Sequence, residues 1–324
     1  MFMHLTHVLE ISIRHGQPAL FLFSEEKIPE QLLLYYLDNL KATFFQGSSM
    51  PEGPEIKRLS SRLKKVLVDK ALAGVEFTYQ GLGAYNQELL SQKIVDVDSR
   101  GKALIISFSE GLSIYSHNQL YGKWLIVRFG KVPKTNRSQR LVISTNRHSA
   151  FLFSASDIQV LKTVDLGSHP FLSKLGPDAL GNATTKNQVL EQLVSKRFRR
   201  RSLGALLLDQ GFIAGLGNYL RSEILFNSKL HPLEKPMNLS EGSLDVLARN
   251  ILGVTRQAYE TSGVTNDLGR VSQLKEKGVK RSRFRFAIFS RNKMPCYVCN
   301  KKIIREEVNG RRLYLCQGCQ PKPL

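Results

Sequence analysis

The segment Met50-Pro51-Glu52-Gly53-Pro54-Glu55-Ile56 opens the part of the chain whose pattern decides the fold. Proline and glutamate are both favoured in the first turn of a helix, because proline has no N–H that would need a partner there and a carboxylate complements the helix dipole. Apolar residues then recur at helical spacing, at Ile56, Leu59, Leu63 and Val66. The sequence therefore predicts that a helix opens this part of the chain.

The 49 residues before Met50 differ from the rest in charge. The whole chain of 324 residues has 47 Lys and Arg against 27 Asp and Glu, a formal net charge of +20. Residues 1–49 hold three basic and five acidic residues, a net charge of −2, so the remaining 275 residues carry +22. The polar, flexible stretch Gly47-Ser48-Ser49 marks the boundary. A positive surplus of this size favours a polyanionic partner, most commonly nucleic acid, and a merely basic surface is the alternative.

The composition also excludes a membrane-spanning protein, because hydrophobic residues make up 42% of the chain and no apolar run is long enough to cross a bilayer. Residues 1–49 do not resemble a secretory signal, since acidic residues and histidines interrupt their apolar stretches. Two apolar clusters, at 20–23 and 32–36, predict a strand and a short helix. The chain is long enough for two ordinary domains with their own cores.

Short strand-like runs separated by glycine and polar turns follow between residues 72 and 155. They lie at 94–97, 103–108, 112–115, 124–127, 141–143 and 151–153. Regular short strands of this kind predict a β-sandwich or barrel. The helical period then returns, with candidate helices at 186–196, 203–210, 217–228 and 241–261. The Lys- and Arg-rich segment 262–283 is predicted to be a mobile loop, and the fold class is α+β with several domains.

All four cysteines lie near the C-terminus, as Cys296-x2-Cys299 and Cys316-x2-Cys319. Each pair can direct two thiolates at one tetrahedral ion from a tight turn, so the spacing predicts a single structural zinc ion. Two disulfides are the rival interpretation, which the absence of an export signal and of further cysteines disfavours. Between the pairs, Asn309-Gly310 is typical of a hairpin turn, and apolar residues flank it on both sides. We therefore expect a zinc-bound β-hairpin.

Further motifs occur in a fixed order between these two ends. They are Ser99-Arg100-Gly101-Lys102-Ala103-Leu104, Tyr115-Ser116-His117-Asn118-Gln119-Leu120-Tyr121-Gly122, Leu206-Leu207-Leu208-Asp209-Gln210 and Gly215-Leu216-Gly217-Asn218-Tyr219-Leu220-Arg221. Together with segment 50–56 and the four cysteines, they resemble the formamidopyrimidine-DNA glycosylase/endonuclease VIII family of base-excision repair enzymes over residues 50–321. The bacterial endonuclease VIII branch is the more similar, because Pro-Glu-Gly-Pro-Glu and the contiguous Gln-Leu-Tyr both match it.

The resemblance implies an N-terminal helix plus β-sandwich domain, a C-terminal helix–two-turn–helix domain and a four-cysteine zinc-finger β-hairpin. The expected boundaries are an extension at 1–49, a catalytic domain at 50–175, a helix–two-turn–helix domain at 176–265, a mobile loop and strand at 266–288, and a zinc finger at 289–324.

The resemblance also implies the chemistry of the site. Pro51 would be the mature N-terminal residue after removal of Met50, and its secondary amine would attack C1′ of the damaged nucleoside. An α-amine has a reference pKa of about 8, so part of it is unprotonated at neutral pH. Glu52 would assist proton transfer during opening of the sugar ring, and Glu55 would position the site. Lys102 would hold a phosphate or assist protonation, although an isolated lysine more often lies solvated at a sheet edge.

Three motif residues would enter the DNA stack. Gln119, Leu120 and Tyr121 would fill the space left by a flipped nucleotide and offset the cost of unstacking; their alternative is an ordinary strand end. Asn218, at a helix start, and Arg311, in the finger, would contact phosphates. The basic run 196–201 is either a solvated face or a source of salt-dependent affinity for DNA.

The implied function is a bifunctional DNA glycosylase and apurinic/apyrimidinic lyase that removes oxidised pyrimidines through a Schiff base, followed by β- and δ-elimination. Its expected partner is damaged double-stranded DNA, with no membrane, a monomeric state and a bacterial cytoplasmic, nucleoid-associated location. An oxidised-purine glycosylase is the alternative within the enzyme class. A non-catalytic damaged-DNA-binding protein is the alternative from another class.

The chain departs from the family pattern at one point, because 49 residues precede Met50. Within a chain the Pro51 nitrogen is a tertiary amide, whose lone pair is delocalised into the carbonyl group and cannot act as a nucleophile. Translation from Met50, proteolytic release of Pro51, and a retained extension with altered activity are the three accounts. We expect the first.

Overall fold

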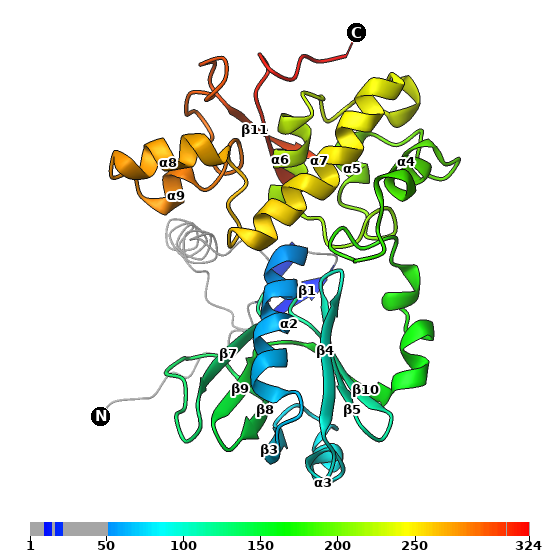
Figure 1. Ribbon diagram of the computed structural model, residues 1–324, viewed down its shortest axis with the longest axis vertical. Coiled ribbons are helices and arrows are strands. Elements are labelled where there is room, and N and C mark those ends of the chain that lie inside the picture. Colours follow the sequence, from blue (N-terminus) through cyan, green and yellow to red (C-terminus); the bar gives the residue numbers. More distant parts are fainter. Residues whose placement is uncertain (1–9, 15–16, 22–50, 309, 324) are drawn as a thin grey trace. The chain divides into compact units, whose positions relative to one another are not determined.

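The computed structural model describes residues 10–14, 17–21, 51–308 and 310–323 (Figure 1). The chain divides into two compact units, Met1–Ser49 and Met50–Leu324. In the first unit, strands β1 (Glu10–Arg14) and β2 (Gln17–Phe21) pair antiparallel, with Glu10 opposite Phe21. Part of the strand predicted at 20–23 thus lies in β2, and the helix predicted at 32–36 lies outside the described residues.

The second unit begins with helix α2 (Gly53–Leu67), which is the predicted helix. Its apolar face is buried through Ile56, Leu63 and Leu67, with Leu59 and Val66 partly buried beside them. These residues share one core with strands of the β-sandwich, so burial of this stripe holds the helix against the strands. Pro51 and Glu52 directly precede the first turn of this helix, with Glu52 as its N-cap residue.

Two four-stranded antiparallel sheets form the sandwich, as the alternating pattern predicts. One sheet has the strand order β10-β6-β5-β4 and the other β3-β8-β9-β7. The strands are β3 (Leu72–Phe77), β4 (Ile94–Arg100), β5 (Ala103–Phe108), β6 (Leu112–His117), β7 (Lys123–Arg128), β8 (Gln139–Thr145), β9 (His148–Phe153) and β10 (Asp157–Lys162). Inward-facing residues of both sheets pack together with the apolar face of α2 in one hydrophobic core.

A helical domain follows the sandwich, with a separate core. Its helices are α4 (Lys186–Val194), α5 (Leu203–Leu206), α6 (Asn218–Asn227) and α7 (Glu241–Glu260), so the second predicted helix is shorter than expected. In the described part of the chain, no helix is long and apolar enough to span a membrane.

The segment predicted as a loop at 262–283 instead contains helices α8 (Leu268–Glu276) and α9 (Arg281–Phe284). Val264, Val271 and Phe284 form a small separate core there, and the Asp267 side chain accepts a hydrogen bond from Arg270 N at the start of α8. The prediction failed because polar and basic residues outnumber the apolar ones in this segment, whereas a few spaced apolar residues suffice for a local core.

The C-terminal hairpin pairs β11 (Ile304–Val308) with β12 (Arg311–Leu315) in an antiparallel register, with Val308 opposite Arg311. The hairpin was predicted from the turn at 309–310, of which the structure describes Gly310 with φ of 68°. Contacts between β12 and α6 attach it to the helical domain.

Candidate active site

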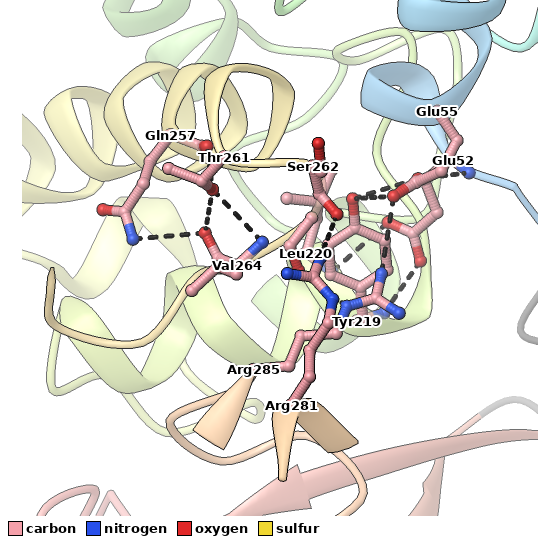
Figure 2. A network of polar contacts seen from close by, with 11 residues as sticks. Glu52, Glu55, Tyr219, Leu220, Gln257, Thr261, Ser262, Val264, Arg281 and Arg285 are labelled. Atoms are coloured by element: carbon pink, nitrogen blue, oxygen red, sulfur yellow. Dashed lines mark hydrogen bonds and ion pairs between the residues drawn. The ribbon is translucent and has the colours of Figure 1, made fainter. Parts of the chain in front are cut away.

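Glu52 lies where the sandwich domain meets the helical domain. The residue is buried, with 3% of its surface exposed. The backbone N–H groups of Tyr219 and Leu220 donate to Oε1 and Oε2 of Glu52 at 2.8 and 3.2 Å. These are free N–H groups of the first turn of α6, so a carboxylate that precedes one helix satisfies the N-terminus of another (Figure 2).

Glycine is required at several points of this contact. A Cβ atom at Gly217 would lie 2.4 Å from the carboxyl carbon of Glu52. The Gly53 N–H donates to Gly215 O at 2.8 Å, and a Cβ at Gly53 would lie 3.0 Å from the Gly215 Cα. Gly215 also has φ of 94°, a left-handed conformation that favours glycine. The Gly-x-Gly motif before Asn218 thus permits the close approach of two backbones.

Glu55 lies on the same turn of α2 and completes a network of polar contacts with Tyr219. The Glu52 N–H donates to Glu55 Oε2 at 3.1 Å. The Tyr219 hydroxyl lies 3.2 and 3.1 Å from Oε1 and Oε2 of Glu55 and donates to this carboxylate. Arg285 Nη2 forms an ion pair with Glu55 Oε1 at 3.5 Å (Figure 2). Tyr219 therefore contacts both acids, one through its backbone and one through its side chain.

Burial raises the pKa of Glu52 to about 7, although the nearby Lys102 ammonium and the N–H groups of α6 oppose the increase. Burial lowers the pKa of Lys102, Glu52 opposes this change and the Arg311 guanidinium adds to it. Lys102 is thus close enough to interact electrostatically with both Glu52 and Arg311. A carboxyl group with a pKa near 7 can both donate and accept a proton at neutral pH.

Lys102 is placed by the turn between β4 and β5. Gly101, directly before it, has φ of 60° and donates its N–H to Asp178 Oδ2 at 2.7 Å. The Asp178 carboxylate also accepts from Leu180 N at 2.8 Å, and burial raises its pKa. This turn is therefore fixed by the segment that leads into the helical domain.

The predicted wedge residues form the turn between β6 and β7. Leu120 and Tyr121 are 57% and 45% exposed and lie next to each other in this turn. The turn itself is held in place, because Gly122 N donates to Asn118 O at 2.7 Å and Gln119 N donates to His117 Nδ1 at 3.0 Å.

Two further contacts hold the same turn from outside. Ser156 Oγ donates to Gln119 Oε1 at 2.9 Å, and Arg137 Nη1 donates to Tyr121 O at 2.5 Å. Two exposed apolar side chains therefore project from a turn that hydrogen bonds keep in one shape.

Asn218, the first residue of α6, is joined to the hairpin through Arg221. The Arg221 side chain is fully buried, and its Nη2 donates to Asn218 Oδ1 at 3.4 Å and to Arg312 O at 3.1 Å. Its Nη1 donates to Gly204 O at 2.8 Å. Arg311 itself is exposed at the start of β12.

The four cysteine sulfurs converge at the base of the hairpin, all within 4.8 Å of one another. Cys296 Sγ lies 3.8 Å from Cys319 Sγ, and Cys299 Sγ lies 3.3 Å from Cys316 Sγ. A tetrahedral zinc ion with Zn–S bonds of about 2.3 Å requires sulfur separations of about 3.8 Å. The cluster can therefore hold a metal ion.

Several residues in or near the site were given no role from the sequence, although Tyr219 and Arg221 belong to the motif at 215–221. Tyr219, Arg221, Glu223 and Arg285 are the most important. Glu223 is fully buried and accepts hydrogen bonds from Ala287 N, Ile288 N and Phe289 N at 2.8 to 2.9 Å. A signal was present, since Arg221 and Glu223 are charged residues that alternate with the apolar residues Leu220, Ile224 and Leu225 in one helix.

Known proteins share this architecture and sequence. The chain matches the formamidopyrimidine-DNA glycosylase N-terminal domain over residues 50–166 and the formamidopyrimidine-DNA glycosylase H2TH domain over residues 175–268. It is 43% identical to Endonuclease 8 of an Escherichia coli strain over 271 residues, which cover 84% of this chain and 100% of the relative. Endonuclease 8 of Shigella sonnei is 42% identical with the same coverage.

Among solved structures, Lactococcus lactis Fpg in complex with DNA containing an abasic site has the same fold, with a TM-score of 0.69 and 22% identity. The similarity covers 84% of this chain and 100% of that one. The chain therefore belongs to the formamidopyrimidine-DNA glycosylase/endonuclease 8 family of DNA-repair glycosylase/lyases.

Proposed function

We propose that the protein is a bifunctional DNA glycosylase and apurinic/apyrimidinic lyase that removes oxidised pyrimidines from duplex DNA through a Schiff base on Pro51. The observation that supports it most is the buried carboxyl group of Glu52, which directly follows Pro51 and has a pKa of about 7. A proton donor and acceptor thus lies next to the residue whose amine would react.

In the first step, the lone pair of the Pro51 amine attacks C1′ of the nucleotide. A bond forms between nitrogen and C1′, and the bond from C1′ to the base breaks with its electron pair leaving on the base. The proton carried by the attacking nitrogen passes to the departing base anion, which leaves a neutral amine on C1′. Glu52 in its protonated form then donates to the ring oxygen O4′, the C1′–O4′ bond breaks, and the nitrogen lone pair forms a cationic iminium group at C1′.

The iminium group then makes the chain cleavage possible. It withdraws electrons from C2′, so loss of a C2′ proton expels the 3′ phosphate, and a second elimination expels the 5′ phosphate. Hydrolysis of the iminium group with water restores the amine. Ionised Glu52 is suited to accept protons in these steps, because a group with a pKa of about 7 exists in both states at neutral pH.

The charged neighbours would hold the DNA. Lys102 lies close enough to both Glu52 and Arg311 to interact with each of them, which places positive charge beside the site. Phosphates next to the lesion would neutralise that charge, with Asn218 at the start of α6 as a further contact.

The exposed Leu120 and Tyr121 would occupy the space of the flipped nucleotide, with Gln119 beside them. In the free protein their apolar surface is in contact with water, whereas insertion into the base stack would bury that surface.

The cysteine cluster would bind one structural zinc ion. Cys296, Cys299, Cys316 and Cys319 would be its ligands, and the ion would fix the base of the hairpin that presents Arg311. Zinc would thus support DNA binding and would take no part in the reaction.

The preference for oxidised pyrimidines rests on the relatives named Endonuclease 8, to which the chain is 42 to 43% identical. The contiguous Gln119-Leu120-Tyr121 segment favours the same branch. Cleavage of duplexes that contain thymine glycol or 8-oxoguanine, compared at equal enzyme concentration, distinguishes the pyrimidine from the purine preference.

The reaction requires a free amine on Pro51. We propose that the active form begins at this residue. Two observations support this proposal: the boundary between the two compact units lies between Ser49 and Met50, and the matched N-terminal domain starts at residue 50. The second candidate, a damaged-DNA-binding protein that retains residues 1–49, would bind DNA without cleaving it.

Borohydride trapping tests the proposal. Borohydride reduces the iminium group to a stable amine, so protein that begins at Pro51 should become covalently attached to a duplex with a damaged pyrimidine. The intact mass of the native protein, measured in parallel, shows which form the cell contains. A Pro51 form that binds the duplex without an adduct would contradict the proposed mechanism and favour the second candidate.

A further inference from the structure

Arg285 lies outside the two matched domain segments, directly after α9, yet its side chain reaches the first turn of α2. Its Nη2 lies 3.5 Å from Glu55 Oε1, and this is the only ion pair of Glu55 with a described residue. We infer that Arg285 is a positioning residue that, through Glu55, fixes the peptide between Pro51 and Glu52. The inference rests on the proposed function, in which the Pro51 amine is the nucleophile.

Arg285 is itself held in place from several directions. Its Nε donates to Gly263 O at 2.7 Å, and its own carbonyl oxygen accepts from Thr265 N at 3.0 Å. Its guanidinium carbon lies 4.5 Å from the centre of the Phe286 ring and 5.7 Å from that of the Tyr219 ring. An arginine side chain fixed in this way presents its charge at one defined point.

The turn after α7 is shaped around the ion pair. Gly263 has φ of 88°, and a Cβ atom there would lie 2.6 Å from Arg285 Nη2 and 3.0 Å from Glu55 Oε1. Beside it, Arg281 Nη2 donates to Ser262 O at 2.5 Å, which ties α9 to the same turn (Figure 2). Only glycine leaves room for the two charged groups to meet.

The path from Arg285 to the amine is short. Glu55 Oε2 accepts from the Glu52 N–H at 3.1 Å, and this N–H belongs to the peptide whose carbonyl is that of Pro51. The orientation of the Glu55 carboxylate therefore sets the orientation of that peptide, to which the amine is attached through a single Cα. The Tyr219 hydroxyl binds the same carboxylate, but it carries no opposite charge.

Loss of the guanidinium would leave Glu55 without its charged partner at a site where both side chains are 27% exposed, with only the neutral Tyr219 hydroxyl and the Glu52 N–H among the described groups still bound to it. The carboxylate would turn toward water and the Glu52 N–H would lose its acceptor. Such partly exposed ion pairs contribute little to folding. A small displacement of a nucleophile, in contrast, strongly reduces the reaction rate.

The test compares Arg285→Met with Lys280→Met in protein that begins at Pro51. Lys280 is exposed and has no ion pair with a described residue. Its replacement by methionine removes one positive charge, as Arg285→Met does, so the two variants have the same net charge. We measure the single-turnover rate of borohydride trapping on a duplex with an abasic site, the Kd for that duplex and the melting temperature. The expected result for Arg285→Met is a rate lowered about tenfold with a Kd changed by less than about twofold, whereas Lys280→Met keeps the original rate.

A double-mutant cycle separates positioning from a general structural effect. If Arg285 acts through Glu55, then Arg285→Met lowers the rate no further in a Glu55→Gln background. Arg285→Lys, which keeps the charge but loses the Nε contact, should have an intermediate rate. Rates are normalised to folded protein, so Arg285→Lys decides the outcome if Arg285→Met does not fold.

Two results would overturn the inference: rates for Arg285→Met or Arg285→Lys equal to the original, or an equal loss with and without Glu55. Failure of the proposed function is a separate outcome, because the unsubstituted protein would then form no adduct at all.

Discussion

The carboxylate of Glu52 accepts a hydrogen bond from the backbone N–H of Tyr219 at 2.8 Å, across 167 positions of the sequence. Glu52, which directly precedes α2 in the sandwich domain, thus accepts hydrogen bonds from free backbone N–H groups at the N-terminus of α6 in the helical domain. Burial at this contact gives the acid its pKa of about 7. The proton transfer that we propose for Glu52 therefore depends on correct contact between the two domains.

Substitution of Glu52 tests this chemistry. Glu52→Gln keeps the shape and can still accept from Tyr219 N, but it cannot donate a proton to the sugar oxygen. We expect the single-turnover rate of base removal to fall by about 10²-fold or more. Glu88→Gln, at an exposed position of helix α3 (Asn86–Leu90), is the matched control and should keep the full rate. A Glu52→Gln rate within about threefold of the control would show that Glu52 is not the proton donor.

The raised pKa of Glu52 makes a prediction for pH. If the protonated form acts, the rate should decline as pH rises through about 7, and this decline should be absent in Glu52→Gln. Because the folded protein binds this proton more tightly than the unfolded chain does, the contribution of Glu52 to stability is present below pH 4.5 and is lost as pH rises through about 7. Urea unfolding of both proteins at several pH values measures it, and parallel pH profiles of unfolding would contradict the assigned pKa.

Gly217→Ala should disturb the same contact without touching either acid. The added Cβ would lie 2.4 Å from the Glu52 carboxyl carbon, so this carboxyl group must move away from α6. We expect a strong loss of base removal in protein that still folds. Gly242→Ala is the control, because nothing lies within 4 Å of a Cβ at that position of α7 and alanine favours the helix. Equal activity of the two variants would mean that the Glu52 position is unimportant.

Leu120→Ala should affect nucleotide flipping but not folding, because Leu120 is 57% exposed. The rate on a base-paired lesion should fall by about tenfold, whereas cleavage of an abasic site in single-stranded DNA should change little. Val132→Ala, at a residue that is 74% exposed, serves as control. If both DNA substrates lose the same factor, insertion into the stack is not the role of Leu120.

Removal of the metal should weaken DNA binding. We expect one zinc ion per chain by elemental analysis, and a chelator or Cys316→Ala should lower affinity for duplex DNA by disordering the hairpin that presents Arg311. Circular dichroism should show the sandwich domain intact. A metal-free protein with unchanged affinity would contradict a structural role in binding.

Local patterns in the sequence predicted α2, six of the eight sandwich strands, the main helices and the cysteine hairpin, because each depends on spacing within a short segment. Strands β3 and β10 were not among the predicted runs. The contacts of Tyr219 and Arg285 could not be predicted in the same way. They join segments more than 150 residues apart, and neither residue type indicates by itself which acid it will meet. Helices α8 and α9 were not predicted. Their small core joins Val271 of α8 and Phe284 of α9 to Val264, which lies outside both helices, so no single helical spacing in the sequence indicates it.

The central claim is that the amine of Pro51 forms the bond to DNA. The most direct measurement is peptide mapping by mass spectrometry of the borohydride-reduced adduct between the protein and a duplex with a damaged pyrimidine. The account predicts a reduced sugar remnant on the nitrogen of Pro51, in a peptide that begins with that residue. A remnant on Lys102 or on any other side chain, or an adduct formed equally well by protein that retains residues 1–49, would contradict it.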